Sequence, residues 1–173
     1  LEEARRMSVP PKFYLDKLEE TASIQTEVKK LRNRALSELQ KLFDKNQNKL
    51  LYVAKVLDAN SAQYKKSTPN DVIYDNMDKF INGDLVEKDK RKTAQRFLDA
   101  ANLDMETLKI RSIVKDSNYF KFIAPKADGF IYHMQTTTMM GRTSTDVVEF
   151  LKNPLNEELL IDLTKKVEKY WMQ

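Results

Sequence analysis

The longest regular pattern in the sequence is an alternation of apolar and polar positions over residues 12–66. This stretch contains neither glycine nor a proline. Its apolar residues are spaced three and four positions apart: Ile24, Val28, Leu31, Ala35, Leu39, Leu42, Leu50, Val53, Leu57 and Tyr64. That spacing places side chains on one face of a helix and approaches the heptad repeat of a coiled coil. The sequence therefore predicts a long amphipathic helix that follows Pro10 and Pro11, a pair that a helix cannot cross.

Asn46 interrupts this seam of apolar residues, inside the polar run DKNQNK at positions 44–49. In one interpretation the helix is continuous, and Asn46 is a polar seam residue that fixes register. In the other, the chain turns here and two helices fold back as a hairpin. The absence of glycine and proline favours the continuous helix. In either case the seam must be covered by a second copy, by another protein or by the rest of this chain.

The first of the shorter helices is predicted over residues 70–81. Thr68 is expected to be its N-cap, with Pro69 at the first helical position. Asn82 and Gly83 are expected to end it, because glycine takes the left-handed conformation that follows many helices. Its apolar residues are expected to face inward: Val72, Ile73, Met77 and Phe80.

Two more helices are predicted before residue 116. The first covers residues 85–101 and is capped by Asp84. A tight turn follows, in which Asn102 is expected to take the left-handed conformation that asparagine tolerates. Asp104 is expected to cap the second helix, which ends near Lys115.

The hydrophobic period changes after these helices. Residues 119–124 and 130–138 are rich in aromatic and β-branched side chains, which favour strands. Asp128 and Gly129 lie between the two segments and favour a tight turn. The sequence therefore predicts a β-hairpin.

The C-terminal residues predict two helices on either side of a break at Asn153 and Pro154. Ser144 or Thr145 is expected to cap the first, which ends near Lys152. The second is expected over 155–171, with apolar residues at helical spacing: Leu155, Leu159, Leu163, Val167, Tyr170 and Trp171. We expect the last two of these residues to anchor the end of the helix to the core.

These elements predict a mainly α-helical protein with a small β-hairpin. Residues 1–66 are expected to form an interaction segment, either a long amphipathic coiled-coil-like helix or a helical hairpin. Residues 67–173 are expected to form a compact helical domain. Its order of three helices and a hairpin is that of a winged helix-turn-helix, an architecture that also serves as a protein–protein module.

The composition excludes several classes of chemistry. The 173 residues include no cysteine, three glycines and one histidine. Without cysteine there are no disulfides, thiolate nucleophiles or Cys-ligated metals. Three widely spaced glycines cannot form a phosphate-binding loop, and we expect no cofactor. The charged start LEEARR predicts no signal peptide, and no apolar run approaches the roughly 20 residues of a membrane span. We therefore expect an intracellular protein, cytoplasmic or nuclear, in a reducing compartment and without membrane contact.

The net charge of +4 raises the question of nucleic acid. In a winged-helix interpretation, the helix over residues 104–115 would present basic residues to DNA, together with the hairpin: Lys109, Arg111, Lys115 and Lys126. However, the excess positive charge lies within residues 1–66, and residues 67–116 carry a net charge of −1. Duplex binding depends mainly on neutralising phosphates, so solvated helix faces explain these cations equally well.

Catalytic and metal-binding patterns are weak. Asp71, Asp75 and Asp78 share one helix face, and carboxylates so placed could hold Mg²⁺ with phosphate substrates. Acids near a helix N-terminus also simply complement the helix dipole. His133 is the only histidine, and no nucleophile motif accompanies it. We therefore assign no catalytic or metal-binding residue and expect a local hydrogen bond at His133.

We predict a non-catalytic interaction or assembly subunit that binds a protein partner, or itself, through the seam. The residues expected to contact the partner are Ile24, Val28, Leu31, Leu39, Leu42, Leu50, Val53 and Leu57. The first alternative is a winged-helix-like DNA-binding protein that uses the helix over 104–115. The second alternative is a helical Mg²⁺-dependent enzyme acting on phosphate substrates.

Overall fold

The protein is described here from a computed structural model. The structure describes the backbone of residues 11–83 and 90–173, and the side chains of 14–83 and 92–173. It is mainly helical, with a small three-stranded antiparallel sheet. The α-helices are α2 (Pro11–Lys45), α3 (Gln47–Leu57), α4 (Asn70–Asn82), α5 (Lys90–Ala101), α6 (Met105–Tyr119), α7 (Ser144–Lys152) and α8 (Glu157–Trp171). The strands are β1 (Ile123–Pro125), β2 (Ile131–His133) and β3 (Thr138–Gly141), and short 3-10 turns lie at Ser61–Gln63 and Pro154–Asn156.

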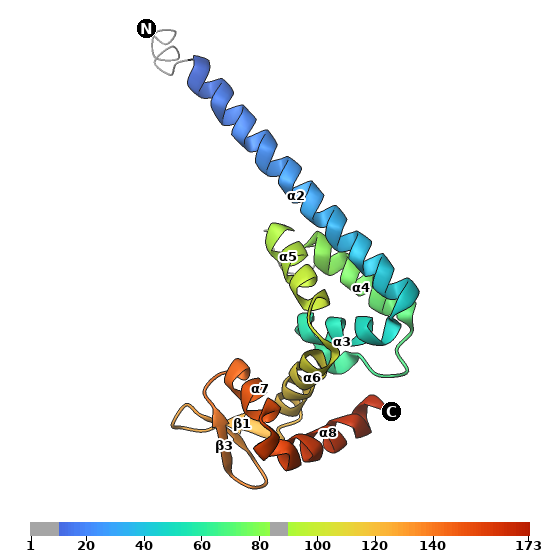
Figure 1. Ribbon diagram of the computed structural model, residues 1–173, viewed down its shortest axis with the longest axis vertical. Helices are drawn as coiled ribbons and strands as arrows, with labels where there is room; N and C mark the ends of the chain where they lie inside the picture. Colours follow the sequence, from blue (N-terminus) through green and yellow to red (C-terminus); the bar gives the residue numbers. More distant parts are fainter. Residues whose placement is uncertain (1–10, 84–89) are drawn as a thin grey trace.

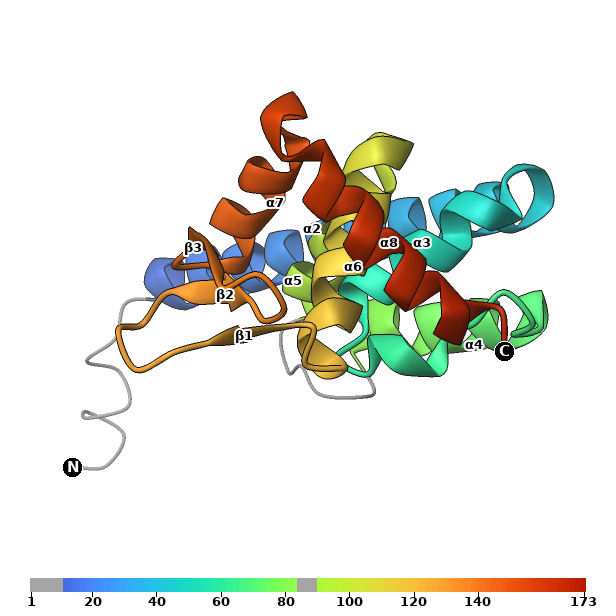
Figure 2. The ribbon, with the colours of Figure 1, turned by 90° about the horizontal axis from the view of Figure 1, so that it is seen from below.

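The long helix α2 extends well beyond the rest of the molecule (Figure 1). Its C-terminal half packs against α4 and α5, and α3 lies beneath all three. The central helix α6 then leads to the sheet, α7 and α8 at the opposite end. Seen from below, α8 crosses α6 (Figure 2). The C-terminal half of α2 and the whole of α3 are therefore packed into the body of the protein, whereas the N-terminal part of α2 projects from it.

The expectation of a continuous helix through Asn46 is wrong. The helix α2 ends at Lys45, and Asn46 leaves helical geometry with φ −148° and ψ 70°. The Asn46 side chain accepts a hydrogen bond from the backbone N–H of Lys49 at 3.2 Å, so it is the N-cap of α3. Asparagine is among the best N-caps, and the polar run around it has no apolar side chain to bury. The chain bends here, and α3 takes a new direction (Figure 1).

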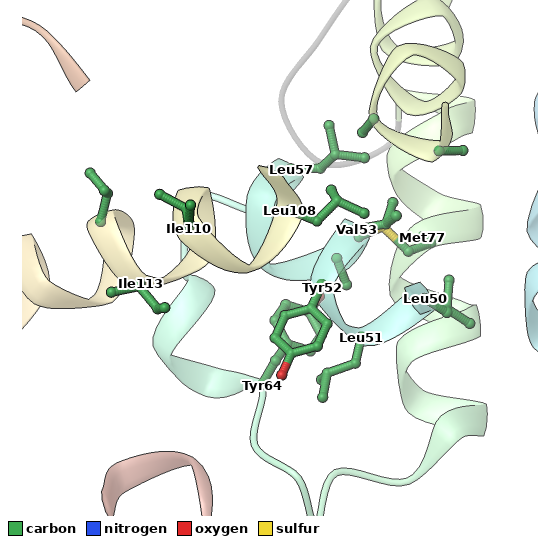
Figure 3. Packing of buried hydrophobic residues seen from close by; sticks show 14 of the residues in the cluster. Leu50, Leu51, Tyr52, Val53, Leu57, Tyr64, Met77, Leu108, Ile110 and Ile113 are labelled. Carbon is green, nitrogen blue, oxygen red and sulfur yellow. The ribbon is translucent and has the colours of Figure 1, made fainter. Parts of the chain in front are cut away.

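The bend allows α3 to enter the core. Leu50, Tyr52 and Val53 are at most 1% exposed. Figure 3 shows this cluster, in which residues of α3 lie beside Met77 from α4 and Leu108 from α6, with Ile110 and Ile113 farther along α6. A helix that is apolar on nearly all sides is stable only when other elements surround it. The seam of α3 is therefore covered by the rest of the same chain.

The helix α4 ends as predicted, and it begins differently. Gly83 is left-handed, with φ 73°, and its N–H bonds to carbonyls of the last turn. The expectation that Thr68 caps the helix is wrong, because Pro69 occupies the N-cap position. The Thr68 hydroxyl instead accepts from the N–H of Lys65 at 2.8 Å and closes the preceding turn. The cap predicted at Asp84 lies outside the described residues.

The turn before α6 confirms one prediction and corrects two. Asp104 is the N-cap, and its carboxylate accepts from the N–H of Thr107 at 3.1 Å. Asn102 is not left-handed, since Lys121 and Thr137 are the only non-glycine residues with positive φ in the described part of the chain. The helix also continues past Lys115 to Tyr119, because packing against α3 and α8 buries Asp116 and Ser117.

The predicted hairpin is a three-stranded sheet in the order β1-β2-β3. The second predicted strand, 130–138, is interrupted after His133 by a turn in which Thr137 has φ 55°. This turn separates β2 from β3. In the register, Ile123 pairs with His133 and His133 pairs with Thr138. Local hydrogen bonds between polar residues stabilise this turn. The spacing of apolar residues in the sequence did not distinguish the turn from a strand.

Two helices follow the sheet. The cap of α7 is Thr143 rather than Ser144 or Thr145, and it forms a capping box with Asp146. In α8 the prediction of an anchor at Trp171 is confirmed: the indole is 2% exposed, and the Trp171 carbonyl accepts from the N–H of Lys66 at 2.8 Å. Tyr170 stacks on Phe120 with 3.9 Å between ring centres.

Candidate functional site

The structure divides the predicted partner-binding seam into a covered part and an exposed part. Five of its residues are less than 9% exposed and are packed within the chain's own core: Leu39, Leu42, Leu50, Val53 and Leu57. These five are not accessible to a partner, because α4, α5 and α6 already cover them. Val28 and Leu31 are half-buried at the edge of the body. Ile24 is 40% exposed and belongs to the projecting part of α2.

We call residues 14–27 the free end of α2, since every one of them is exposed. Tyr14, Leu15 and Leu18 are 63%, 58% and 50% exposed. At about 100° per residue, these three and Ala22 fall within an arc of about 100° around the helix axis. The free end therefore carries an apolar stripe that no other described part of the chain covers.

The charges of the free end lie on another side of the helix. Asp16, Glu19, Glu20 and Glu27 fall within an arc of about 100°, centred about 140° from the centre of the apolar stripe. With Lys17, these residues give the free end a net charge of −3. The free end is thus an acidic amphipathic helix. Its apolar stripe was not predicted, although Leu15, Leu18 and Ala22 have the necessary spacing of three and four.

A buried ion pair joins three helices at the centre of the molecule. The Lys55 ammonium on α3 lies 2.8 Å from the Asp116 carboxylate on α6, and their side chains are 1% and 0% exposed. Asp116 also accepts from the Ser61 hydroxyl at 2.7 Å and from the Trp171 indole N–H on α8 at 2.5 Å. Lys55 donates a further bond to the Ser61 carbonyl at 3.1 Å.

This arrangement explains why two charges tolerate burial. Burial lowers the pKa of Lys55, and its hydrogen bond to Asp116 opposes that effect. Buried charges must be paired and hydrogen-bonded to avoid a large penalty. All the partners come from the same chain and the pair is closed to solvent, so the pair holds α3, α6 and α8 together. Its members are 61 residues apart, and no local sequence signal connects them.

The residues predicted to contact nucleic acid differ in their surroundings. The Lys115 ammonium donates to three carbonyl groups at the end of α3, those of Lys55, Val56 and Asp58. Burial lowers the pKa of Lys115. The Lys109 ammonium lies 5.9 Å from the centre of the Tyr52 ring. Lys115 therefore acts as a cap for α3 and has its three hydrogens directed inward.

The other two predicted contacts are exposed, as Lys109 is. Arg111 lies on the outer side of α6 and lines a cavity. Lys126 lies in the β1–β2 turn, with its ammonium 4.4 Å from the centre of the Tyr132 ring. More than half of α6 is buried among α3, α7 and α8, so less than half of this helix faces solvent.

His133 has the local hydrogen bond that was predicted, and a second partner as well. Its Nδ1 lies 2.8 Å from the Thr136 hydroxyl and accepts from the Thr136 N–H at 3.3 Å. Its Nε2 lies 3.0 Å from the Asp162 carboxylate on α8. Lys166 pairs with the same carboxylate at 2.9 Å. The histidine is 1% exposed and ties the β2–β3 turn to α8.

The carboxylates considered for Mg²⁺ are not gathered into a site. Asp75 pairs with Lys79 at 2.8 Å, and Asp78 accepts from the Asn82 side-chain amide at 3.4 Å. Within the described part of the chain, no three His, Asp or Glu side chains are placed to hold a metal ion together.

Comparisons with models of known families, with curated proteins and with solved structures found no match. Among the described helices, none combines the length and the apolar character that crossing a bilayer requires.

Proposed function

We propose that this protein is an interaction or assembly subunit that docks on a protein partner through the free end of α2. The observation that carries the proposal is the apolar stripe formed by Tyr14, Leu15 and Leu18 on a helix that projects from the body. Side chains of this size that stay half-exposed leave hydrophobic stabilisation unused until another surface covers them.

The way the free end is held supports this role. An isolated helix of this length is only marginally stable in water. Here the helix continues into residues 28–45, which the body holds on two sides through α4 and α5. The free end is therefore presented as a preformed helix, which reduces the entropy lost on binding. A helix with an apolar stripe and a charged outer face fits the mode in which a helix lies in a groove.

The charge of the free end points to a partner of a different kind rather than a second copy. Pairing two free ends would place a net charge of −3 beside another −3, and such repulsion opposes association. A groove with apolar walls and basic residues on its rim would complement both sides of the helix. We therefore expect the partner to be a protein with a basic-rimmed apolar groove.

The test replaces Leu15 and Leu18 together by glutamine, which keeps helix propensity and removes the two leucines of the apolar stripe. The matched control is Val72→Gln, because Val72 is 46% exposed on α4, away from the free end. Each protein is used to capture partners from a cell extract, and a captured protein is then purified and titrated. We expect the double variant to weaken binding by about 2 kcal/mol, or roughly 30-fold in Kd, and the control to have no effect.

Two results would contradict the proposal. One is equal binding of the purified partner by the double variant and the unmodified protein. The other is binding that does not weaken as salt is raised, because the acidic face requires an electrostatic contribution. Sedimentation of the protein alone is measured in parallel. Self-association that is lost in the double variant would replace the proposed partner by a second copy of the chain.

A further inference from the structure

A cavity of about 260 Å³ lies between α6, α7 and the end of α3. The helices α6 and α7 lie side by side in both views of the ribbon (Figures 1 and 2). The residues that line the cavity are Val56, Arg111, Val114, Lys115, Asn118, Ser144, Thr145 and Val148. The lining thus combines three valines, two cations and three neutral polar side chains, and it contains no carboxylate.

The two cations are in different states. The Lys115 ammonium donates hydrogen bonds to three carbonyl groups at the end of α3. It therefore offers a ligand positive charge and no hydrogen bond. The guanidinium of Arg111 has no hydrogen bond or ion pair within the described residues. Arginine presents a planar fork of donors that matches a carboxylate. Arg111 is therefore the one charged group of the lining that is available to a ligand.

Three acids on neighbouring elements have partners of their own. Asp116 is engaged by Lys55, Ser61 and Trp171. Asp146 of α7 accepts from the N–H groups of Arg142 and Thr143. Asp58 receives the Tyr64 hydroxyl at 2.6 Å. None of these three acids lines the cavity, so the charged side chains of its lining are all positive.

We propose that this cavity binds a small organic carboxylate. The apolar body of the ligand would pack against Val56, Val114 and Val148, and its carboxylate would form a two-point contact with the Arg111 guanidinium. Small-molecule sites typically combine apolar walls with a few polar groups that fix orientation. The cavity is formed by α3, α6 and α7 and does not include the free end of α2, so this inference is independent of the proposed function.

The experiment uses benzoate as the probe and follows amide and methyl signals of the isotope-labelled full chain by NMR. Benzamide has the same shape without the charge, and inorganic phosphate has the charge without the apolar body. For a probe of this size we expect a Kd of about 1 mM. We expect the largest shifts at Val114, Val148 and Arg111, and at least tenfold weaker binding of benzamide and of phosphate.

The variant Arg111→Gln removes the fork of donors, and its fold is expected to persist because Arg111 is exposed. We expect it to weaken benzoate binding at least tenfold. The control Lys126→Gln removes an exposed cation from the β1–β2 turn and should leave the affinity unchanged. Three results would overturn the proposal: no shifts in the cavity with benzoate near 20 mM, about twentyfold the expected Kd; benzamide or phosphate binding as tightly as benzoate; or unchanged benzoate binding by Arg111→Gln.

Discussion

Replacement of Lys55 by methionine tests whether the ion pair at the centre of the molecule stabilises the fold. Methionine keeps most of the length and volume of the lysine stem and removes the ammonium. The Asp116 carboxylate would then stay buried with two donors, the Ser61 hydroxyl and the Trp171 indole. Removing one partner of a buried pair typically costs 3–5 kcal/mol, since it leaves an uncompensated charge. Because two donors remain, we expect a loss of about 3 kcal/mol.

The free energy of unfolding is measured by urea titration, with the fluorescence of Trp171 as the signal. Trp171 is the only tryptophan in the chain and lies against the pair, with the Lys55 ammonium 4.7 Å from the centre of its ring. Lys126→Met is the control, because Lys126 is exposed in the β1–β2 turn and should change stability by no more than about 0.5 kcal/mol.

The double variant Lys55→Met with Asp116→Asn separates charge from packing. It removes the uncompensated charge, so we expect it to be more stable than Lys55→Met alone. A loss of less than about 1 kcal/mol in Lys55→Met would refute the reasoning. It would mean that the buried Asp116 carboxylate costs little free energy without its lysine partner. Strictly additive losses in the double variant would refute it equally, because a pair in contact must be coupled.

Two further predictions concern helix caps. Asn46→Ala removes the N-cap of α3, and we expect a loss of about 1 kcal/mol in urea unfolding; an increase in stability would favour a continuous helix instead. Asp104→Asn keeps a capping side chain at α6 and removes its charge. Hydrogen bonds from the Thr107 hydroxyl and N–H lower the pKa of Asp104 from its usual value. The ionised carboxylate therefore stabilises the folded protein above the usual pKa, and this stabilisation is lost as the pH falls through the lowered pKa. We therefore expect acid unfolding of Asp104→Asn to depend less steeply on pH than that of the unmodified protein, and an identical dependence would contradict the assignment.

Local chemistry in the sequence was sufficient to predict most of the helices. Gly83 ends α4 because glycine takes positive φ without a steric penalty, and Asp104 begins α6 because its carboxylate can reach the N–H groups of the first turn. Trp171 was predicted to anchor α8 from its place at the end of an apolar stripe. These features depend on residues within one or two helical turns of each other, which is the range that pattern and propensity describe.

Neighbouring residues were not sufficient to predict the structure where two local conformations fit the sequence almost equally well. At Asn46 a continuous helix and a capped break were both compatible with the sequence. The break is the observed outcome, because it allows Leu50 and Val53 to be buried by α4 and α6. After His133 the strand could have continued. Its side chain instead bonds to Thr136 within the turn and to Asp162 on α8.

The sequence alone determined that an apolar seam exists and that something must cover it. Only the tertiary structure decided that the chain itself covers the seam from Val28 onward and leaves residues 14–27 exposed. The same holds for Lys55 and Asp116, which are separated by 61 residues and meet at 2.8 Å. The physical reason is that a helical period fixes which face of a helix is apolar, whereas the choice of surface that covers this face depends on how distant segments pack together.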